Sequence, residues 1–419
     1  MNNYTSSDKR LTFIERLKGI GPATITTAAC IGPGSVTTLS VIGATYEYGL
    51  LWMLVLFIFF HIAQSDMCAR IALGGGKTFQ QAIREDIENP ILRKITIIII
   101  VVSVFVTCII YQFGSLMGVG IGLNFFFPNI SPGHLAGIAG VIAIPIILMA
   151  NLQAIENVLK YLILGFTASF LITIILTRPN MMEVMRGAFI PSIPRGAGPH
   201  MMSLTGTSMI TGYLFFIQTT AIKEKWSGPS DIYRARSDIF IMSPITILVS
   251  AMIMITAGAT LYRTGVDITS AAVLGEQLIP LYGNKAKFAF GIGLACAGFS
   301  SVIPAGMGPG IVIPGILGFE SSMKTKFFKV LIIINLSVAS LMAFIGTKPV
   351  ILVMSAQALG AIFIPITSFI LLMLTNNKKL MKNYTNNFLV NLVGILAVIF
   401  SLIISITSLS PMISNIFAK

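Results

Sequence analysis

Charged residues are scarce in this chain. Only 10% of its 419 residues are charged and 55% are hydrophobic, whereas an average soluble domain is about 25% charged. So few charges cannot cover the surface of a soluble protein of this length. Apolar stretches of about 20 residues, long enough to cross a bilayer, recur along the chain. They are too long and too continuous for barrel strands, so the sequence predicts an all-α membrane protein.

Long polar segments are missing as well. The segments between apolar stretches have at most about two dozen residues, too few to bury a core of their own. The apolar stretches contain no His-Glu-x-x-His pattern, nucleophile–base pair or carboxylate cluster. The sequence therefore excludes an attached soluble enzyme, and we expect neither enzymatic activity nor a cofactor. Transport and sensing are the main functions that remain.

Paired cysteines are absent too. The chain has four cysteines, Cys30, Cys68, Cys108 and Cys296, and each lies in an apolar stretch without metal-ligand spacing. We interpret them as small core residues.

The chain has a net charge of +13, but it has no basic run with interleaved aromatic residues of the kind that forms a nucleic-acid groove. With a cytoplasmic N-terminus, the Lys- and Arg-rich loops all fall inside: Arg70–Lys94, Lys223–Asp238, Glu320–Lys329 and Thr375–Lys382. This is the positive-inside pattern. We expect a multi-pass protein of the inner (cytoplasmic) membrane, with its C-terminus outside and the lipid bilayer, not nucleic acid, as its partner.

The apolar pattern predicts about eleven membrane-spanning helices. They lie near residues 20–46, 49–71, 94–115, 134–150, 157–177, 200–222, 237–262, 286–318, 327–346, 349–375 and 387–411. The predicted organisation is a cytoplasmic tail (1–19), a first five-helix repeat (20–177), a second, inverted five-helix repeat (200–375) and an extra C-terminal helix (387–411).

Two of these spans carry helix-breaking residues. Gly32-Pro33-Gly34 stands in the middle of the first span, where proline removes a hydrogen bond and glycine favours unwinding. The sixth span is interrupted by Gly206-Thr207-Ser208 and then by Thr211-Gly212-Tyr213. Breaks five spans apart are typical of inverted-repeat transporters, in which unwound backbone binds the solute. Ordinary packing kinks remain the alternative.

The eighth span contains a third Gly- and Pro-rich interruption, from Ala297 to Gly310. It is compatible with either a hinge or close helix packing.

Several motifs together resemble the Nramp family of proton-coupled divalent-metal transporters. Those motifs are Gly21-Pro22-Ala23, Ile31-Gly32-Pro33-Gly34-Ser35, the stretch Gly43–Trp52, Gln64-Ser65 with Ala69-Arg70, Gly122-Leu123-Asn124, Ala297–Ser301, Pro365 and Thr375–Met381. The resemblance covers spans one to ten in order. It implies an amino-acid-transporter-like (LeuT-type) fold of two inverted five-helix repeats with broken helices 1 and 6, and uptake of Mn, Fe or Mg ions by symport.

The chain departs from the family at the metal-binding motif. The family's first-span Asp-Pro-Gly-Asn, whose Asp and Asn bind the metal, falls on Gly32 and Ser35. The sixth-span Met-Pro-His-Asn falls on Ile210–Tyr213, unless a one-residue slip puts Met209 at the thioether position. The acidic residues of the third span, which help carry protons in the family, fall on Gln112 and Ser115.

A site of hydroxyls and backbone groups suits a dehydrated transition metal poorly, because desolvating a cation without charged ligands is costly. The solute is therefore either a divalent metal ion or a small organic acid, amino acid or other non-metal solute, and a non-transporting sensor is a third alternative. A proton or another cation is the candidate coupling ion. The candidate substrate-binding residues are Gly32, Gly34, Ser35, Thr38, Thr207, Met209, Ile210, Thr211 and Gln357.

The candidate proton or ion pathway consists of Gln112, Ser115 and His61. His61 has an unperturbed pKa of about 6.5 and is either a proton carrier or a hydrogen-bonding strut. Asp66 lies four residues before Arg70, the spacing of a structural ion pair on a helix.

Overall fold

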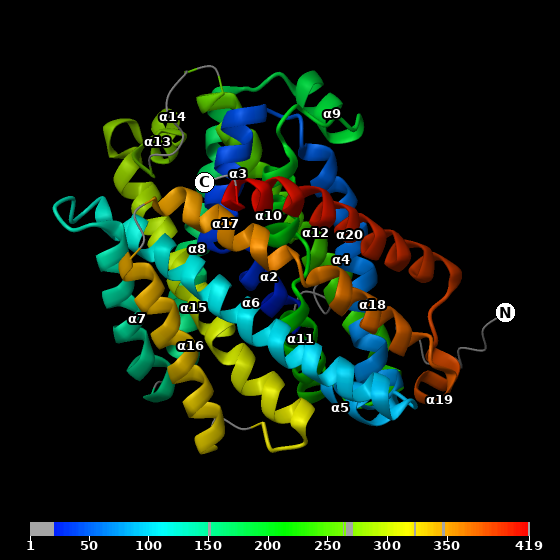
Figure 1. The fold of residues 1–419 in the computed structure, drawn as a ribbon. Helices are drawn as coiled ribbons and strands as arrows, with labels where there is room; N and C mark the ends of the chain where they lie inside the picture. Colours follow the sequence, from blue (N-terminus) through cyan, green and yellow to red (C-terminus); the bar gives the residue numbers. More distant parts are fainter. Residues whose placement is uncertain are drawn as a thin grey trace.

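The chain folds into a bundle of helices (Figure 1). This computed structural model describes residues 21–149, 152–262, 264, 271–321, 324–345 and 348–417, so the predicted N-terminal tail (1–19) lies outside the described residues. The α-helices are α2 (Ala23–Cys30), α3 (Pro33–Tyr46), α4 (Leu51–Ala69), α5 (Phe79–Asp86), α6 (Pro90–Asn124), α7 (Pro132–Met149), α8 (Leu152–Thr177), α9 (Met181–Phe189), α10 (Gly198–Ser208), α11 (Gly212–Lys225), α12 (Ile232–Leu261), α13 (Ala271–Glu276), α14 (Ile279–Tyr282), α15 (Ala286–Leu317), α16 (Lys326–Ile345), α17 (Pro349–Ala361), α18 (Ile364–Thr375), α19 (Lys378–Met381) and α20 (Phe388–Phe417). Helices α6, α17 and α20 run obliquely across steeper helices such as α4 and α12 (Figure 1).

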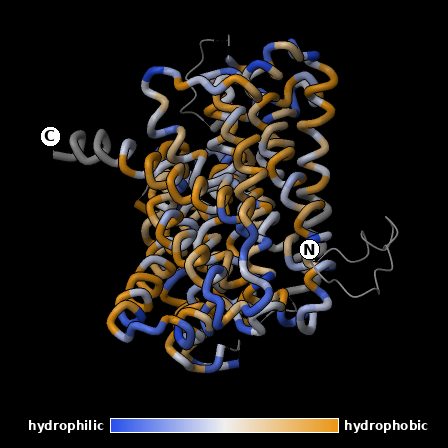
Figure 2. Tube along the Cα trace, turned by 90° about the vertical axis from the view of Figure 1, so that its right-hand side faces the viewer, coloured by the Kyte–Doolittle hydropathy of each residue, from blue (hydrophilic) through white to orange (hydrophobic). Residues whose placement is uncertain are grey.

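Seven helical stretches in the described part of the chain are long and apolar enough to cross a membrane. They are Leu51–Gly74, Pro90–Asn124, Pro229–Leu261, Ile279–Leu317, Lys326–Ile345, Pro349–Thr375 and Phe388–Ser408. Two shorter apolar helices, at 132–148 and 164–177, and two interrupted helices, α2/α3 and α10/α11, occupy the four remaining predicted spans. Hydrophobic residues cover the flanks of the bundle and hydrophilic ones gather towards its ends (Figure 2). The predicted all-α membrane architecture is confirmed.

Helices α6 and α15 lie side by side through the centre of the bundle (Figure 1). Glycines at their contact let the two backbones approach. A β-carbon at Gly298 would lie 2.5 Å from the Cγ2 atom of Val119, and one at Gly122 would lie 2.5 Å from the carbonyl oxygen of Gly291. Small residues at such contacts are a common means of joining helices in a bilayer. This close packing fixes the framework around which the broken helices lie.

The eighth span is continuous, so its expected interruption is not a break. Helix α15 runs from Ala286 to Leu317 with Pro304, Pro309 and Pro314 inside it. Each proline removes one backbone hydrogen bond, but membrane helices tolerate this loss where neighbouring helices pack around them. The Gly- and Pro-rich sequence of this span therefore serves close packing rather than unwinding.

A buried ion-pair cluster joins α4 to α12 at the end of the bundle that the charge pattern predicts to be cytoplasmic. The Asp66 carboxylate accepts hydrogen bonds from Arg70 Nε at 2.7 Å and from Arg236 Nε at 2.6 Å. Nearby, the Asp238 carboxylate accepts the backbone N–H groups of Gly21 and Ala23 at 3.0 Å each, at the start of α2. The predicted Asp66–Arg70 pair is confirmed as a structural contact, and Arg236 extends it.

Candidate functional site at two helix breaks

The first break separates α2 from α3. Helix α2 ends at Cys30, Gly32 is extended (φ −96°, ψ 179°), and α3 begins at Pro33. Proline has no N–H and is favoured at the first helical position, so this sequence both ends one helix and starts another. The Ser35 hydroxyl donates to the carbonyl oxygen of Cys30 across the break. The predicted broken first helix is confirmed, with its unwound residues at Ile31 and Gly32.

The second break separates α10 from α11. Helix α10 ends at Ser208, and Met209 and Thr211 are extended (ψ 156° and 149°) before α11 begins at Gly212. The expected interruption at Gly206-Thr207-Ser208 is wrong, because these residues form the last turn of α10. Gly206 instead permits a close approach, since a β-carbon there would overlap the backbone carbonyl of Gln357 in α17.

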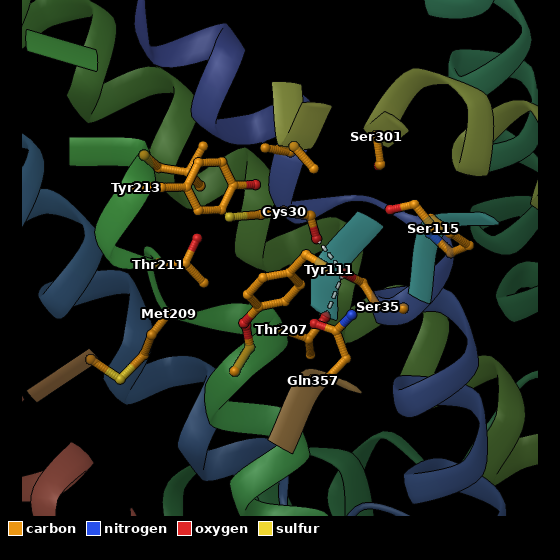
Figure 3. A pocket seen from close by; sticks show the side chains of 17 residues that line it. Cys30, Ser35, Tyr111, Ser115, Thr207, Met209, Thr211, Tyr213, Ser301 and Gln357 are labelled. Atoms are coloured by element: carbon orange, nitrogen blue, oxygen red, sulfur yellow. Dashed lines mark hydrogen bonds between the residues drawn. The ribbon is translucent and has the colours of Figure 1, made fainter. Parts of the chain in front are cut away.

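A small cavity lies between the two breaks (Figure 3). Its lining residues come from both broken helices and from α6, α15 and α17: Ala29, Cys30, Gly32, Pro33, Gly34, Ser35, Tyr111, Ser115, Gly206, Thr207, Met209, Thr211, Tyr213, Leu214, Ser301, Ala305 and Gln357. The volume open to a water molecule is about 30 Å³, enough for one or two waters or a single small ion. None of these described lining residues carries a carboxylate, an amine, a guanidinium or an imidazole.

Hydroxyl groups connect the two breaks across the cavity. The Thr207 hydroxyl donates to the Ser35 hydroxyl at 2.6 Å, and the Tyr111 hydroxyl donates to the carbonyl oxygen of Gly206 at 2.5 Å (Figure 3). The Ser301 hydroxyl is buried without a hydrogen-bond partner and would lie 2.5 Å from a β-carbon at Gly32. Buried polar atoms are normally paired, so Ser301 is available to a bound solute or water.

Most of the predicted binding residues lie at this cavity. Gly32, Gly34, Ser35, Thr207, Met209, Thr211 and Gln357 line it, and so does Ser115 from the predicted ion pathway. Two of the predicted binding residues, Thr38 and Ile210, do not line the cavity. Thr38 is fully buried in the packing of α3, and Ile210 belongs to an apolar cluster. Their positions near the breaks do not bring their side chains to the cavity.

The remaining two predicted pathway residues lie away from the cavity. Gln112 is fully buried in α6 with both amide atoms unpaired, and His61 in α4 contacts α10 instead. Tyr111 lines the cavity one residue before Gln112. Tyr111 and Ser115 are four residues apart and share a helix face, so helical spacing from Ser115 could have identified Tyr111.

Met209 lines the cavity without aiming its sulfur at it. Its thioether points away from Ser35, Thr207 and Gln357 in Figure 3 and belongs to the main apolar cluster of the bundle. The slip that could bring Met209 to the family's thioether position therefore does not provide a sulfur ligand in this conformation.

Sequence reasoning missed several lining residues. Cys30 was interpreted as a core residue, and Tyr213, Ser301 and Ala305 were not singled out as binding residues, yet all four line the cavity. Cys30 is the last residue of α2 and Tyr213 the second of α11. Both flank a break directly, and this adjacency was the signal that could have found them.

Known proteins resemble this chain in both sequence and fold. The chain matches the Nramp family (natural resistance-associated macrophage protein-like) over residues 23–411. It is 25% identical to the divalent metal cation transporter MntH of Yersinia pestis, covering 92% of each chain. Among solved structures it resembles a mutant of the manganese transporter of Eremococcus coleocola (TM-score 0.77, 19% identity, 98% of this chain and 90% of that one). It also resembles MhsT in complex with L-phenylalanine (TM-score 0.62, 14% identity, 93% and 98%).

The two structural matches show that the fold is shared at 19% and 14% sequence identity. The predicted fold class is thereby confirmed, whereas the residue limits of the two repeats stay a prediction. With a family match over nearly the whole chain, apolar helices that suit a bilayer and two broken helices around a polar cavity, the chain belongs to the Nramp family of membrane transporters.

Proposed function

We propose that this protein transports a hard divalent cation of the Mg²⁺ and Mn²⁺ class across the cytoplasmic membrane, with its N-terminus on the cytoplasmic side. One observation carries the proposal: the polar side chains that line a cavity of about 30 Å³ between two helix breaks are mostly neutral oxygen donors, and none of the described ones is a carboxylate. Its relatives include divalent metal cation transporters and a manganese transporter.

The ligand chemistry supports a hard cation. Such ions prefer oxygen ligands, and the cavity offers the hydroxyls of Ser35, Thr207 and Thr211 and the amide of Gln357. Softer metals prefer sulfur or imidazole. The Met209 thioether is turned into the apolar core, which leaves the Cys30 thiol as the one remaining sulfur among the described lining residues, without a second soft ligand. The C-terminal ends of α2 and α10 add the negative ends of two helix dipoles.

The lack of a carboxylate among the described lining residues determines how tightly the ion is held. Neutral ligands compensate only part of the cost of desolvating a divalent cation. The ion therefore keeps part of its water shell, and we expect a dissociation constant on the order of 0.1–1 mM, the range of weak oxygen sites.

Cavity size disfavours the organic solutes that the sequence left open, because room for one or two water-sized groups is too small for an organic acid or amino acid of several heavy atoms. Sites for drug-sized organic molecules usually enclose about 300–1,000 Å³, about 10 to 30 times the room between these breaks. A small anion is the second candidate. The N-terminal ends of α3 and α11 begin beside the cavity, and neither has a side-chain cap. Uncapped N-termini attract anions.

Uptake by purified protein in proteoliposomes tests the proposal. Vesicles should accumulate Mn²⁺ and Mg²⁺, and protein-free vesicles should not. The double variant S35A/T207V should lose at least about 10-fold in uptake rate, because it removes two cavity hydroxyls. S340A is the matched control, since Ser340 is buried but donates to its own helix at Leu336. Uptake of a small organic acid or anion without metal uptake would contradict the proposal.

A further inference from the structure

A buried histidine contacts the second helix break from outside the cavity. His61 in α4 is 2% exposed, and its Nε2 atom lies 2.8 Å from the carbonyl oxygen of Ser208. A carbonyl can only accept, so Nε2 carries the hydrogen and donates it. Ser208 is the last residue of α10, and the carbonyls of a last helical turn have no partner within the helix. His61 therefore replaces a hydrogen bond that the break removes.

The same face of α4 makes a second polar contact, to α18. Gln64 lies three residues after His61, and its Nε2 atom donates to the Ser368 hydroxyl at 2.9 Å. Next to Ser368, Thr367 contacts Gly212, the first residue of α11, so closely that a β-carbon there would overlap it. Helices α4 and α18 thus hold the two sides of the break, one on the end of α10 and the other on the start of α11.

We propose that His61 is a positioning residue for transport: its Nε2–H fixes the end of α10, and with it Thr207 and Met209 at the cavity. The role requires a hydrogen-bond donor at this point and not a titratable group. The neighbouring residue Thr207 bonds to Ser35 across the cavity, so a displaced α10 end would disturb the contact that joins the two breaks.

Two substitutions separate a donor from a proton carrier. In H61Q the amide nitrogen takes the place of Nε2 and can still donate, but the side chain no longer titrates. In H61L the Ser208 carbonyl loses its partner. Because an unpaired buried carbonyl is costly, we expect H61L to raise the KM for Mn²⁺ uptake about 10-fold or more, whereas H61Q stays within about 3-fold of the parent protein.

The pH profile is the second readout. We expect H61Q to keep the parent protein's dependence of uptake on pH between about pH 6 and pH 8, the range in which an unperturbed imidazole titrates. A loss of that dependence in H61Q would assign His61 a proton-carrying role and overturn the inference. So would an H61Q variant as impaired as H61L, or an H61L variant that resembles the parent. The matched control is T256V, which removes a buried hydroxyl that donates to the Phe170 carbonyl of α8 and to the Met252 carbonyl of its own helix, α12. Thr256 does not line the cavity, so T256V should leave KM unchanged.

The uptake assay rests on the proposed function, so a transport-independent readout accompanies it. Cys30 lines the cavity, which is too small in this structure to admit an alkylating reagent, so the rate of Cys30 alkylation by N-ethylmaleimide in a C68A/C108A/C296A background reports how often the break opens. H61L should raise this rate at least about 3-fold and H61Q should not. A parent protein without metal uptake would refute the proposed substrate, while unchanged Cys30 labelling in H61L would refute the role of His61. If H61L does not fold, H61N replaces it, since its amide is too short to reach Ser208.

Discussion

The two helix breaks form one cavity but are built in different ways. The first is encoded by nearby residues: Pro33 prevents α2 from continuing into α3, and the Ser35 hydroxyl of the same broken helix donates to the Cys30 carbonyl. The second contains no proline. The carbonyls at the end of α10 are paired by distant side chains, Gly206 by Tyr111 from α6 and Ser208 by His61 from α4. A break can therefore be specified by its own residues or by the helices around it.

The largest effect should come from adding a side chain at Gly206, where α10 contacts the backbone of α17 next to the second break. G206V would place side-chain carbon against the Gln357 backbone, and backbone cannot move aside as a flexible side chain can. We expect about 3 kcal/mol or more of destabilisation, measured as a lower unfolding temperature in detergent, with loss of uptake. Gly165 offers the control, since a β-carbon there meets nothing within 4 Å, and G165A should be neutral or stabilising. A G206V protein as stable as G165A would contradict the role given to Gly206.

The next effect tests the local character of the first break. P33A restores an N–H and would allow α2 and α3 to join more readily. We expect Mn²⁺ uptake to fall about 10-fold with little loss of thermal stability, because extra helix is itself favourable. Pro349 also stands at the first position of its helix, α17, but it begins the span Pro349–Thr375 and does not stand at a break within it, so P349A should leave uptake unchanged. Equal effects of the two substitutions would remove the distinction between the breaks.

A smaller effect tests the long-range support of the second break. Y111F removes one hydroxyl and leaves the Gly206 carbonyl unpaired at the edge of the cavity. A water molecule can partly replace the lost donor there, so we expect only an about 3-fold rise in KM for Mn²⁺ uptake. Combined with H61L, the loss should exceed the product of the single effects if both side chains hold the same helix end. Simple multiplication of the two effects would show that they act independently.

The smallest effect concerns Met209. Its thioether packs in the apolar cluster, so M209L, a change that nearly conserves volume, should alter Mn²⁺ uptake by less than about 2-fold. A strong loss of uptake, or a specific loss of Cd²⁺ inhibition, would indicate that the sulfur binds metal in another conformation.

The contrast between the breaks also explains what the sequence could predict. Gly32-Pro33-Gly34 breaks a helix by covalent geometry alone, so the first break was visible in the sequence, as were the apolar spans. The second break was expected at Gly206–Ser208 and again at Thr211–Tyr213, and only the latter segment includes a residue of the observed break. The first of these was wrong because a glycine can serve a close approach of two helices as well as unwinding. The contacts of His61 and Tyr111 join residues 147 and 95 positions apart, and periodicity within one helix carries no information about such pairs.

Competition between metals tests the central claim most directly. Mn²⁺ uptake into proteoliposomes should be measured alone, with excess Mg²⁺ and with an equal amount of Cd²⁺. A cavity whose polar side chains are mainly neutral oxygens, with the Met209 thioether turned away and the Cys30 thiol as the remaining sulfur among the described lining residues, predicts that excess Mg²⁺ inhibits Mn²⁺ uptake and that Cd²⁺ inhibits no more strongly than an equal amount of unlabelled Mn²⁺. Strong inhibition by Cd²⁺ with indifference to Mg²⁺ would contradict it.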